Sequence, residues 1–570
     1  MLNGYDFEVF KHDWMVVIIN PVEQTSVEIV NDREKLKQYY EAHNKQIWIG
    51  YNSRNYDQYI IKAILLGMDP KKVNDFIILK GRKGWEYSSL FNRIQLYNYD
   101  VMNSFYSLKQ LEGFLGNNIH ETPVRFDIDR QLTQEEIKRT IEYCTSDVEN
   151  TLEIFLQTKP DFDAHMNLLK TFNLPLSNIS KTKAQLSAMA LGCTRKEWFD
   201  EWDLHFVDTL QLGKYGYIKD WFKDPNNHDY NNSLITNVCG VPHKFGWGGL
   251  HGAPDQPLHR KGLLLHVDVN SFYPSIMIRY DMLSRNVADK AVYKQIYDTR
   301  LALKAAGKKA EQAPYKIILN ATYGICKDPT SAAYDPRQAN NVCVNGQLLL
   351  LDLLEHLEAV EGFELIQSNT DGLIIQIPDT DAAFDAVDDV CYEWEQRTGM
   401  GLGFDVITEI FQKDVNNYLF KFENGKIERK GAYVKPLNRL DNDLPIVNKA
   451  VVDYMIHGTP VRKTIEDCHD LIMFQKIVKL SSKYKYAWHN GRRLEDKTFR
   501  VFASYRDADG YIGKQKDDGA TIEKFANTPA HCFIVNDNVN GKDTRDYLLF
   551  KDWYIDLALK RLHAFEVYGR

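Results

Sequence analysis

The stretch Leu264-Leu-His-Val-Asp-Val-Asn-Ser-Phe-Tyr-Pro-Ser275 carries an apolar run that ends near Asp268 and passes into a polar turn. Such a run is typical of a strand that is buried on both faces. A second aspartate, Asp371, lies in Gln367-Ser-Asn-Thr-Asp-Gly372 between two further apolar runs, which predicts a β-hairpin with Asp371 at its tip. Two carboxylates at neighbouring strand ends can hold divalent cations.

Cationic side chains lie between these two aspartates at helical spacing. In Lys316-Ile-Ile-Leu-Asn-Ala-Thr-Tyr-Gly324, the side chains of Lys316, Asn320 and Tyr323 share one helix face. Arg300 and Lys304 are also four residues apart, and like charges at that spacing repel each other. Alone, such a pair is more often a solvated face. Beside Lys316, the pattern predicts a site for a triphosphate, whose charge would reverse the repulsion.

The N-terminal region contains a second set of carboxylates. In Tyr5-Asp-Phe-Glu-Val-Phe10 the alternation predicts a strand with Asp6 and Glu8 on one face. The polar turn Gly50-Tyr-Asn-Ser-Arg-Asn-Tyr-Asp-Gln58 adds Asn52 and Asp57. By itself, an acidic pair on a strand is usually just a solvated face.

A capping box predicts the helix that completes this second set. Thr133-Gln-Glu-Glu136 is the helix start, and the helix places Tyr143 and Asp147 on one face. Four carboxylates at one site repel each other unless cations occupy it. The pattern is therefore typical of two-metal phosphodiester hydrolysis, with Tyr143 placed to orient the attacking water.

These segments, in this order, resemble a known family. The strings D-x-x-S-F-Y-P-S, K-x-x-x-N-A-x-Y-G and N-T-D-G are similar to motifs A, B and C of the family B DNA polymerases. The N-terminal segments resemble the DEDD-type 3′–5′ exonuclease domain of proofreading polymerases, and the length and order most resemble the phage-type members. One departure concerns motif C, because Asn369 replaces the first aspartate of the usual D-T-D. Asp268 and Asp371 are then the essential pair.

The resemblance implies an α/β and α+β multidomain fold, in which an RNase H-like exonuclease domain precedes a palm, fingers and thumb. The expected boundaries are an exonuclease domain at 1–155, a connector at 156–244, palm at 245–290 and 329–430, fingers at 291–328, and a thumb with a C-terminal extension at 431–570.

The resemblance also implies a role for each matching residue. The expected ligands of two Mg²⁺ ions at each site, or of Mn²⁺ as a substitute, are Asp268, Val269 (by its carbonyl) and Asp371 at one site and Asp6, Glu8, Asp57 and Asp147 at the other. The expected nucleotide-binding residues are Arg300, Lys304, Lys316, Asn320, Tyr323 and Tyr273, of which Tyr273 is a steric gate against a 2′-hydroxyl. Arg125 lies near the position where related phage enzymes carry a lysine at the exonuclease site.

Contacts with DNA are expected from several further segments. They are Asn52, Ser107 and Leu108 in Ser107-Leu-Lys-Gln-Leu111, Trp247 in Phe245-Gly-Trp-Gly-Gly249, Lys430 and Tyr433 in Arg429-Lys-Gly-Ala-Tyr433, and Lys483 and Lys485 in the basic and aromatic stretch 476–500. The alternatives are an ordinary helix start at Ser107, a glycine-rich surface turn at Trp247 and a solvated basic hairpin at 476–500.

Bulk properties are compatible with this interpretation. A chain of 570 residues predicts three or more domains or subdomains. The net charge of −8 argues mildly against a nucleic-acid partner. The distribution of charge over the surface matters more for binding than the net charge does. Eight scattered cysteines and the lack of an 18-residue apolar stretch predict reduced thiols in a soluble, monomeric, intracellular protein, in the bacterial host cytoplasm if the origin is a phage.

The predicted function is template-directed synthesis of phage or mobile-element DNA with 3′–5′ proofreading. The expected partners are primer-template DNA, dNTPs and replication accessory proteins, without a membrane. The short intervals Tyr273–Lys316 and Gly324–Asp371 leave no room for the two insertions of the protein-primed branch, so a nucleic-acid primer is expected. Two alternatives remain: a non-catalytic nucleic-acid-binding protein on a decayed polymerase fold, suggested by Asn369, and an exonuclease whose polymerase half only clamps DNA.

Overall fold

The computed structural model describes residues 2–102, 105–122 and 124–568. The chain divides into two compact units, each built from separate segments. Unit 1 comprises Met1–Lys181, Leu437–Ile446 and Glu466–Tyr554, and unit 2 comprises Thr182–Pro436, Val447–Ile465 and Ile555–Arg570. Several sheets with helices around them confirm the predicted mixed α/β multidomain class. Within the described ranges, no helix has both the length and the apolar character needed to cross a bilayer.

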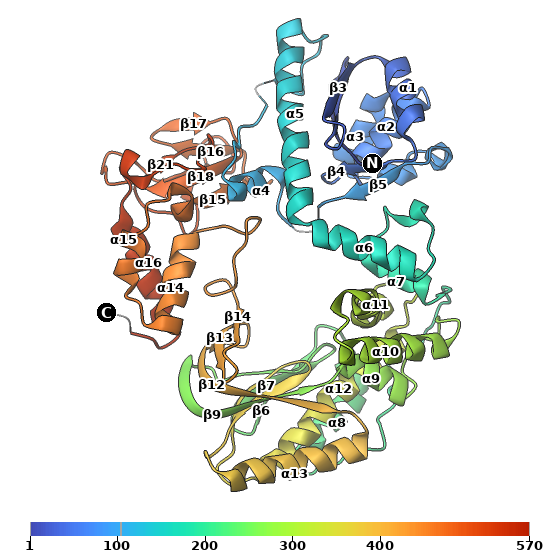
Figure 1. Cartoon of the computed structure of the whole chain (residues 1–570), viewed down its shortest axis with the longest axis vertical. Helices are drawn as coiled ribbons and strands as arrows, with labels where there is room; N and C mark the ends of the chain where they lie inside the picture. Colours follow the sequence, from blue (N-terminus) through green and yellow to red (C-terminus); the bar gives the residue numbers. More distant parts are fainter. Residues whose placement is uncertain (1, 103–104, 123, 569–570) are drawn as a thin grey trace. The chain divides into compact units, whose positions relative to one another are not determined.

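Unit 1 begins with a mixed sheet in the order β3-β2-β1-β4-β5. Its strands are β1 (Leu2–Val9), β2 (Trp14–Asn20), β3 (Thr25–Val30), β4 (Ile47–Gly50) and β5 (Tyr97–Asp100). β1 pairs antiparallel with β2 and parallel with β4. Helix α5 covers one face, and the helices α1, α2 and α3 cover the other (Figure 1). Their bounds are α1 (Arg33–His43), α2 (Asp57–Leu65), α3 (Pro70–Ile78) and α5 (Gln134–Gln157).

Strand alternation explains the two faces of β1. Tyr5 and Phe7 belong to the core that includes α2, whereas Asp6 and Glu8 point to the side of α5. Gly4 lies under α5, because a Cβ there would come within 2.8 Å of Leu152 Cγ. The predicted capping box of α5 is confirmed: Thr133 Oγ1 accepts from the Glu136 amide, and the Glu136 side chain accepts from the Thr133 amide.

The C-terminal segment of unit 1 forms two small sheets, in the orders β15-β18-β21 and β17-β16-β19-β20. Their strands are β15 (Lys476–Lys479), β16 (Tyr486–His489), β17 (Arg492–Leu494), β18 (Thr498–Ala503), β19 (Gly513–Gln515), β20 (Glu523–Lys524) and β21 (Cys532–Ile534). Helix α4 (Leu108–Leu115) packs against β15 and β18. The predicted C-terminal domain at 431–570 is therefore divided between the two units.

Arg500 of β18 joins α4 to this segment. Its side chain is 0% exposed. The guanidinium donates to the carbonyls of Gly113 at 3.1 Å, Asn117 at 2.8 Å and Asp537 at 2.7 Å, and to Gln475 Oε1 at 2.9 Å. Burial lowers the pKa of Arg500 to about 10, yet the group remains protonated at neutral pH. One cation thus satisfies carbonyls from segments that are distant in the sequence.

Unit 2 is organised around a long sheet in the order β14-β13-β12-β9-β11-β10-β8-β7-β6. Its strands are β6 (Ser233–Val238), β7 (Val241–Gly246), β8 (His251–Gly252), β9 (Leu258–Val269), β10 (Glu364–Ser368), β11 (Gly372–Gln376), β12 (Leu402–Asp414), β13 (Asn417–Phe422) and β14 (Ile427–Lys430). The predicted strand that ends near Asp268 is β9, and β11 and β12 flank it. The predicted hairpin around Asp371 is β10–β11, which confirms that part of the sequence interpretation.

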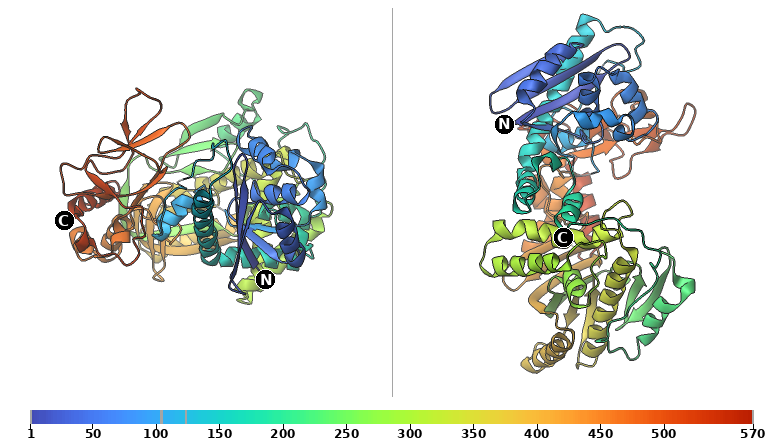
Figure 2. Two further views of the ribbon diagram at one scale, coloured as in Figure 1. Left: turned by 90° about the horizontal axis from the view of Figure 1, so that it is seen from above. Right: turned by 90° about the vertical axis from the view of Figure 1, so that its right-hand side faces the viewer.

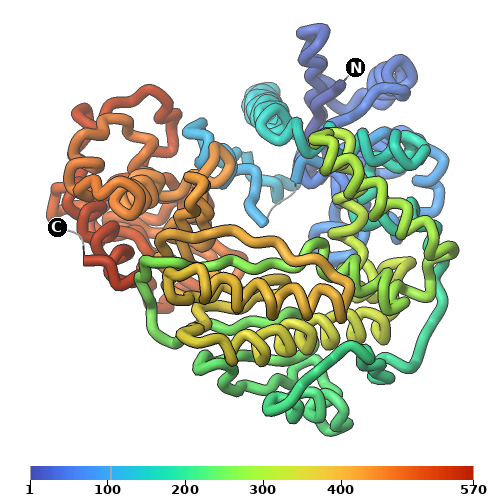
Figure 3. The backbone as a smooth tube through the Cα atoms, turned by 60° about the horizontal axis from the view of Figure 1, so that its bottom comes forward, coloured from blue at the N-terminus to red at the C-terminus, as the bar shows by residue number. Residues whose placement is uncertain are grey.

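Helices α12 (Pro336–Leu357) and α13 (Asp381–Thr398) lie side by side along this sheet (yellow in Figure 3). The leucines of Leu348–Leu354 are buried, as expected for a core helix. Helices α10 (Lys290–Ala305) and α11 (Lys309–Lys327) pack together (lime green in Figure 2), near α9 (Phe272–Arg279).

The remaining helices are short or peripheral. They are α6 (Lys159–Thr171), α7 (Lys183–Ala190), α8 (Gly216–Lys223), α14 (Pro445–His457), α15 (Val461–Glu466) and α16 (Lys551–His563), with 3₁₀ turns at Gly84–Glu86, Ser89–Arg93, Leu176–Asn178, Pro225–Asn227, Leu471–Phe474 and Thr544–Asp546.

Replacing the buried guanidinium tests whether it holds unit 1 together. We expect Arg500→Leu to lower the free energy of unfolding by at least about 3 kcal/mol, because several buried carbonyls lose their donor. The exposed Arg492→Leu, which removes the same charge, should change it by less than about 0.5 kcal/mol. Guanidinium denaturation and hydrogen exchange of the α4 amides measure both. Equal midpoints for the two variants would contradict the role assigned to Arg500.

Candidate active sites

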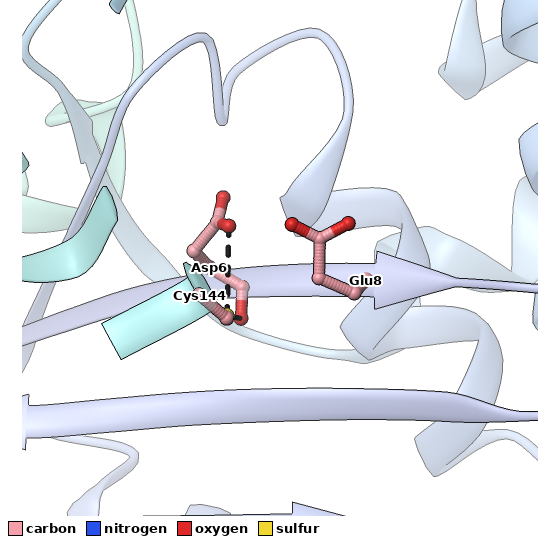
Figure 4. Close-up of side chains that lie close together, drawn as sticks. All are labelled: Asp6, Glu8 and Cys144. Carbon is pink, nitrogen blue, oxygen red and sulfur yellow. Dashed lines mark hydrogen bonds between the residues drawn. The ribbon is translucent and has the colours of Figure 1, made fainter. Parts of the chain in front are cut away.

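The first candidate site lies in unit 1, where β1 meets α5. Figure 4 shows the carboxylates of Asp6 and Glu8 on the same side of β1, beside Cys144 of α5. Ligand atoms of these three residues lie within 4.8 Å of one another. Cys144 Sγ donates to the Asp6 carbonyl at 3.4 Å and lies 3.6 Å from Asp6 Oδ2. Burial raises the pKa of Cys144 well above its usual value, so it is a thiol donor rather than a thiolate ligand.

Two further aspartates face the same place from other elements. Asp57 is the first residue of α2, and its Oδ1 accepts from the Phe7 amide at 3.3 Å. Asp147 lies one turn beyond Tyr143 on α5 and accepts from Lys109 Nζ at 2.6 Å. The structure therefore brings together the carboxylates that the sequence analysis singled out in three separate segments.

The electrostatics of these carboxyl groups reflect their proximity. Burial raises the pKa of Asp6, and the charges of Asp57 and Asp147 raise it further. Burial also raises the pKa of Glu8, followed by the charges of Asp6 and Asp147. For Asp57, burial raises the pKa to about 8. Buried carboxylates that repel one another in this way fit a hard divalent cation, which binds oxygen ligands and offsets their charge.

Lys109 is a member of this site that the sequence analysis missed. It is 8% exposed, and its Nζ lies 2.6 Å from Asp147 Oδ1, 2.9 Å from Glu112 Oε2 and 4.5 Å from the centre of the Tyr143 ring. Burial lowers its pKa, but the charges of Asp147 and Glu112 outweigh burial and the net pKa is raised. Burial raises the pKa of Glu112 to about 8. The available signal was the pair Lys109 and Glu112, three residues apart in the largely apolar helix α4.

Arg125, in contrast, does not reach these carboxylates. It is exposed, and its guanidinium pairs with Asp127 at 2.6 Å. The cation that contacts Asp147 in this structure is Lys109.

The residues of unit 1 that are expected to contact single-stranded DNA lie at a turn and at a helix start. Asn52 has a φ of 57°, and its Oδ1 accepts from Asn55 Nδ2 at 2.8 Å. Ser107 caps α4 in a capping box with Gln110, and Leu108 is half-buried as the first residue of that helix. Leu108 directly precedes Lys109, and Ser107 is two residues before it. For Asn52, Ser107 and Leu108, contact with DNA stays a prediction.

The second candidate site lies in unit 2, at the end of β9. Gly372 pairs with Asp268, and the Val269 amide donates to the Asp371 carbonyl at 2.8 Å. These contacts bring the two predicted carboxylates to one sheet edge. They open into a cavity of about 820 Å³. Its lining includes Asp268, Val269, Tyr273, Arg300, Lys304, Asn320, Tyr323 and Asp371.

The tip turn explains what Asn369 does. Its Oδ1 lies 3.4 Å from the Asp371 amide, so the side chain supports the turn that carries Asp371. Behind the turn, Ser368 Oγ contacts His243 Nε2 at 2.7 Å. A Cβ on Gly249 would lie 2.2 Å from Thr370 Oγ1, so the glycine permits the close approach.

Trp247 is more deeply buried than a residue on a glycine-rich surface turn would be. The indole is 4% exposed and lies among aromatic rings, with Trp202 at 4.6 Å and Phe222 at 5.5 Å between centroids. Its Nε1 donates to the Asn227 carbonyl at 3.2 Å. The ring is enclosed on its faces and its polar atom has a partner, so it anchors the glycine-rich turn. Its contact with a base or sugar stays a prediction.

Asp268 has electrostatic neighbours of both signs. Burial raises its pKa, His266 lowers it, Asp371 and Asp405 raise it, and Lys304 lowers it. Asp405 pairs with His266 across β12 and β9, so it lies on the sheet face that carries Asp268. The sequence analysis missed this third acid. The available signal was Asp405 within the predicted strand Leu402-Gly-Phe-Asp-Val406.

The cationic side of the cavity comes from α10. Arg300 Nη1 donates to Ser271 Oγ at 2.7 Å, and Lys304 is close enough to Asp268 to lower its pKa. Asn320 and Tyr323 of α11 line the cavity, whereas Lys316, one turn before Asn320, is exposed and lies outside the lining. The structure thus brings together Arg300, Lys304, Asn320 and Tyr323 with the aspartates, and leaves Lys316 at the periphery.

Tyr273 forms an aromatic wall of the cavity. Its ring centre lies 4.7 Å from that of Tyr323, and burial raises the pKa of its hydroxyl. A Cβ on Gly346 would lie 3.0 Å from Tyr273 Cε1, so α12 presses on the ring from behind. The ring is therefore held in one place.

The other predicted DNA contacts are scattered. Lys430 is exposed at the end of β14, and the Tyr433 ring lies 4.9 Å from the Arg561 guanidinium. In unit 1, Lys485 pairs with Asp517 at 2.5 Å, and Lys483 Nζ lies 5.6 Å from the Tyr484 ring centre. These four residues stay predictions as DNA contacts.

Comparisons with known proteins add a structural likeness. No protein-family model matches the chain, and no curated protein matches it. Among solved structures, the chain is similar to the family B DNA polymerase from the hyperthermophilic archaeon Pyrobaculum calidifontis, at 14% identity and a TM-score of 0.44. The match covers 100% of this chain and 78% of that chain. A similarity at this level carries no inference about activity, so function is argued from the residues.

Metal binding and pH should together determine the thermal stability of unit 1. Because burial raises the folded-state pKa of Asp57 to about 8, the folded protein holds a proton that the unfolded chain releases near pH 4. Stability is therefore present at low pH and is lost as the pH rises toward 8. We expect Tm of the metal-free protein to fall by several degrees between about pH 5 and about pH 8. Mg²⁺ should raise Tm more at the higher pH, because it binds the ionised carboxylates.

The control for this effect is Asp57→Asn, which should reduce both the pH dependence and the Mg²⁺ response in differential scanning calorimetry. An unchanged pH dependence in that variant would show that other groups are responsible.

Proposed function

We propose that this protein is a DNA-directed DNA polymerase of the family B type with a 3′–5′ proofreading exonuclease. Synthesis is assigned to the carboxylate site of unit 2 and editing to that of unit 1. The assignment includes an RNase H-like exonuclease domain near 1–155, for which the sheet order β3-β2-β1-β4-β5 is supporting evidence. Palm, fingers and thumb roles at 245–290, 291–328, 329–430 and 431–570 are part of the same proposal.

One observation carries the polymerase assignment. Asp268 and Asp371 face Arg300 and Lys304 across one cavity of about 820 Å³. An anion rich in charge, bound through divalent cations, needs carboxylates on one side and guanidinium or ammonium groups on the other. A nucleoside triphosphate meets that description, and the cavity volume lies within the range of ligand sites.

The side chains of the cavity divide the work. Arg300 and Lys304 bind the triphosphate and neutralise the charge that develops on the departing pyrophosphate, and Lys316 adds positive charge from one turn before Asn320 on α11. Tyr323 packs on the nascent base pair, and Asn320 lines its edge. The fixed ring of Tyr273 excludes a 2′-hydroxyl, which favours deoxynucleotides.

The nuclease assignment depends on the four carboxylates of unit 1. Asp6, Glu8, Asp57 and Asp147 would hold divalent cations there, as Asp268, the Val269 carbonyl and Asp371 would in unit 2. When bound, Mg²⁺ or Mn²⁺ would lower the pKa of the attacking water or hydroxyl group and would neutralise negative charge at both sites. Tyr143 orients the water at the editing site, and Lys109 holds Asp147 in place.

Separating the two activities tests the proposal. We expect Asp268→Ala to abolish primer extension with Mg²⁺ and dNTPs, while it still degrades the primer, because its editing carboxylates remain. The double variant Asp6→Ala/Glu8→Ala should extend the primer and fail to degrade it. Synthesis that survives in Asp268→Ala would refute the assignment of the polymerase site, and degradation that survives in the double variant would refute that of the nuclease.

A finer test concerns the position of Asp268. A Cβ on Gly403 would lie 3.0 Å from Asp268 Oδ1, so Gly403→Ala must displace the carboxylate. We expect primer extension to fall by roughly threefold to tenfold, because the carboxylate must shift by a few tenths of an ångström and a displacement of about 1 Å at a reacting centre costs about 100-fold. The control is Gly401→Ala, whose Cβ would lie 3.5 Å from its nearest neighbour, Asn270 Nδ2. Primer degradation should be unchanged in both variants, and an equal loss of synthesis in both would contradict this interpretation.

A further inference from the structure

The basic stretch 476–500 contains exposed cations that form no ion pair with an acidic side chain. Among the residues that the structure describes, these are Lys479, Lys483, Arg492 and Lys497. Of the others, Lys476 pairs with Asp443 at 2.5 Å, Lys485 pairs with Asp517, Arg493 pairs with Asp518, and Arg500 is buried. Lys479 and Lys497 differ from Lys483 and Arg492 in their place at the end of the β15–β18 pair.

Both lysines lie at one end of the β15–β18 pair. Lys479 is the last residue of β15 and pairs with Thr498 of β18. The Leu480 amide donates to the Lys497 carbonyl at 2.7 Å, which continues the pairing by one residue. Lys497 is thus opposite Leu480 and diagonal to Lys479 at the end of the small sheet, within electrostatic range of Lys479.

This end of the sheet is joined to the chain segment that follows α4. Asp496 Oδ1 accepts from the Glu121 amide at 2.9 Å, and the Ile119 amide donates to the Asn536 carbonyl at 3.0 Å. With the contacts of Arg500 to Gly113 and Asn117, residues 113–121 are held along β18.

The same segment leads back to the carboxylate site. The Glu121 carboxyl is half-buried; burial raises its pKa, and the charges of Lys109 and Lys497 lower it. Burial lowers the pKa of Lys479, and the charge of Glu121 raises it. Glu121 thus lies within electrostatic range of Lys109, which contacts Asp147, and of the two exposed lysines. Residues 113–121 continue from α4, which carries Lys109, so the small sheet is held against the element that borders the carboxylate site.

We propose that Lys479 and Lys497 bind the phosphates of a single-stranded DNA end as it enters the carboxylate site of unit 1. This inference rests on the proposed exonuclease function. A site with four carboxylates repels a polyanion, so a strand needs cations along its approach. Exposed lysines without competing partners can supply them. A single strand is the appropriate ligand, because it is the substrate of a 3′–5′ exonuclease and tracks along basic grooves.

The test compares Lys479→Ala/Lys497→Ala with a matched control, Lys37→Ala/Lys45→Ala. The control removes two charges at and just after helix α1 of the same unit, where Lys37 lies 3.9 Å from Glu41. On a single-stranded oligothymidylate, we expect the first variant to raise KM for degradation roughly tenfold with kcat unchanged, and the control to leave both unchanged. Lys479→Arg/Lys497→Arg should retain the wild-type KM.

Salt dependence gives a second readout that needs no catalysis. The slope of log affinity for oligothymidylate against log salt should become shallower by roughly 1.4, about 0.7 for each lost phosphate contact. If the wild type degrades nothing, the exonuclease proposal fails, while this slope still tests the strand path. An unchanged slope and KM would overturn the inference. An equal loss of affinity for blunt duplex DNA would also overturn it, because the lysines would then belong to a duplex surface.

Discussion

Mutual repulsion among buried carboxylates is the constraint on which the rest of unit 1 depends. Asp6, Glu8, Asp57 and Asp147 come from a strand and two helices, and burial raises the pKa of each. A fold selected only for stability would replace such groups with apolar side chains. The sheet, the two helix layers and Lys109 hold them in place, so the unit keeps a destabilising charge cluster that a cation can relieve.

In unit 2 the repulsion between carboxylates is weaker. Asp268 is half-buried, and Asp371 is exposed at a turn that Asn369, His243 and Gly249 support. Fewer carboxylates lie in direct contact, and Arg300 and Lys304 face them across the cavity. The two sites therefore differ in how they balance charge. One relies on a single buried lysine, and the other relies on an open cationic wall.

Local patterns predicted the parts of the fold that depend on local physics. The buried strand β9, the hairpin at Asp371 and the capping box of α5 follow from periodicity and turn chemistry. Lys109 and Asp405 could not be placed, because each joins its site through packing between distant elements. The burial of Trp247 could not be predicted for a related reason: a glycine-rich turn in a sequence does not indicate which rings will enclose its tryptophan.

The guanidinium of Arg500 has a consequence for how the chain acquires its structure. It binds carbonyls of residues that precede it by 387 and 383 positions. During synthesis, α4 therefore emerges long before its partner strand exists. Contacts of such long sequence separation slow folding, and the early segment must wait while almost 400 intervening residues are made. Neither unit is complete until the last part of the chain exists, because unit 1 runs to Tyr554 and unit 2 includes Ile555–Arg570.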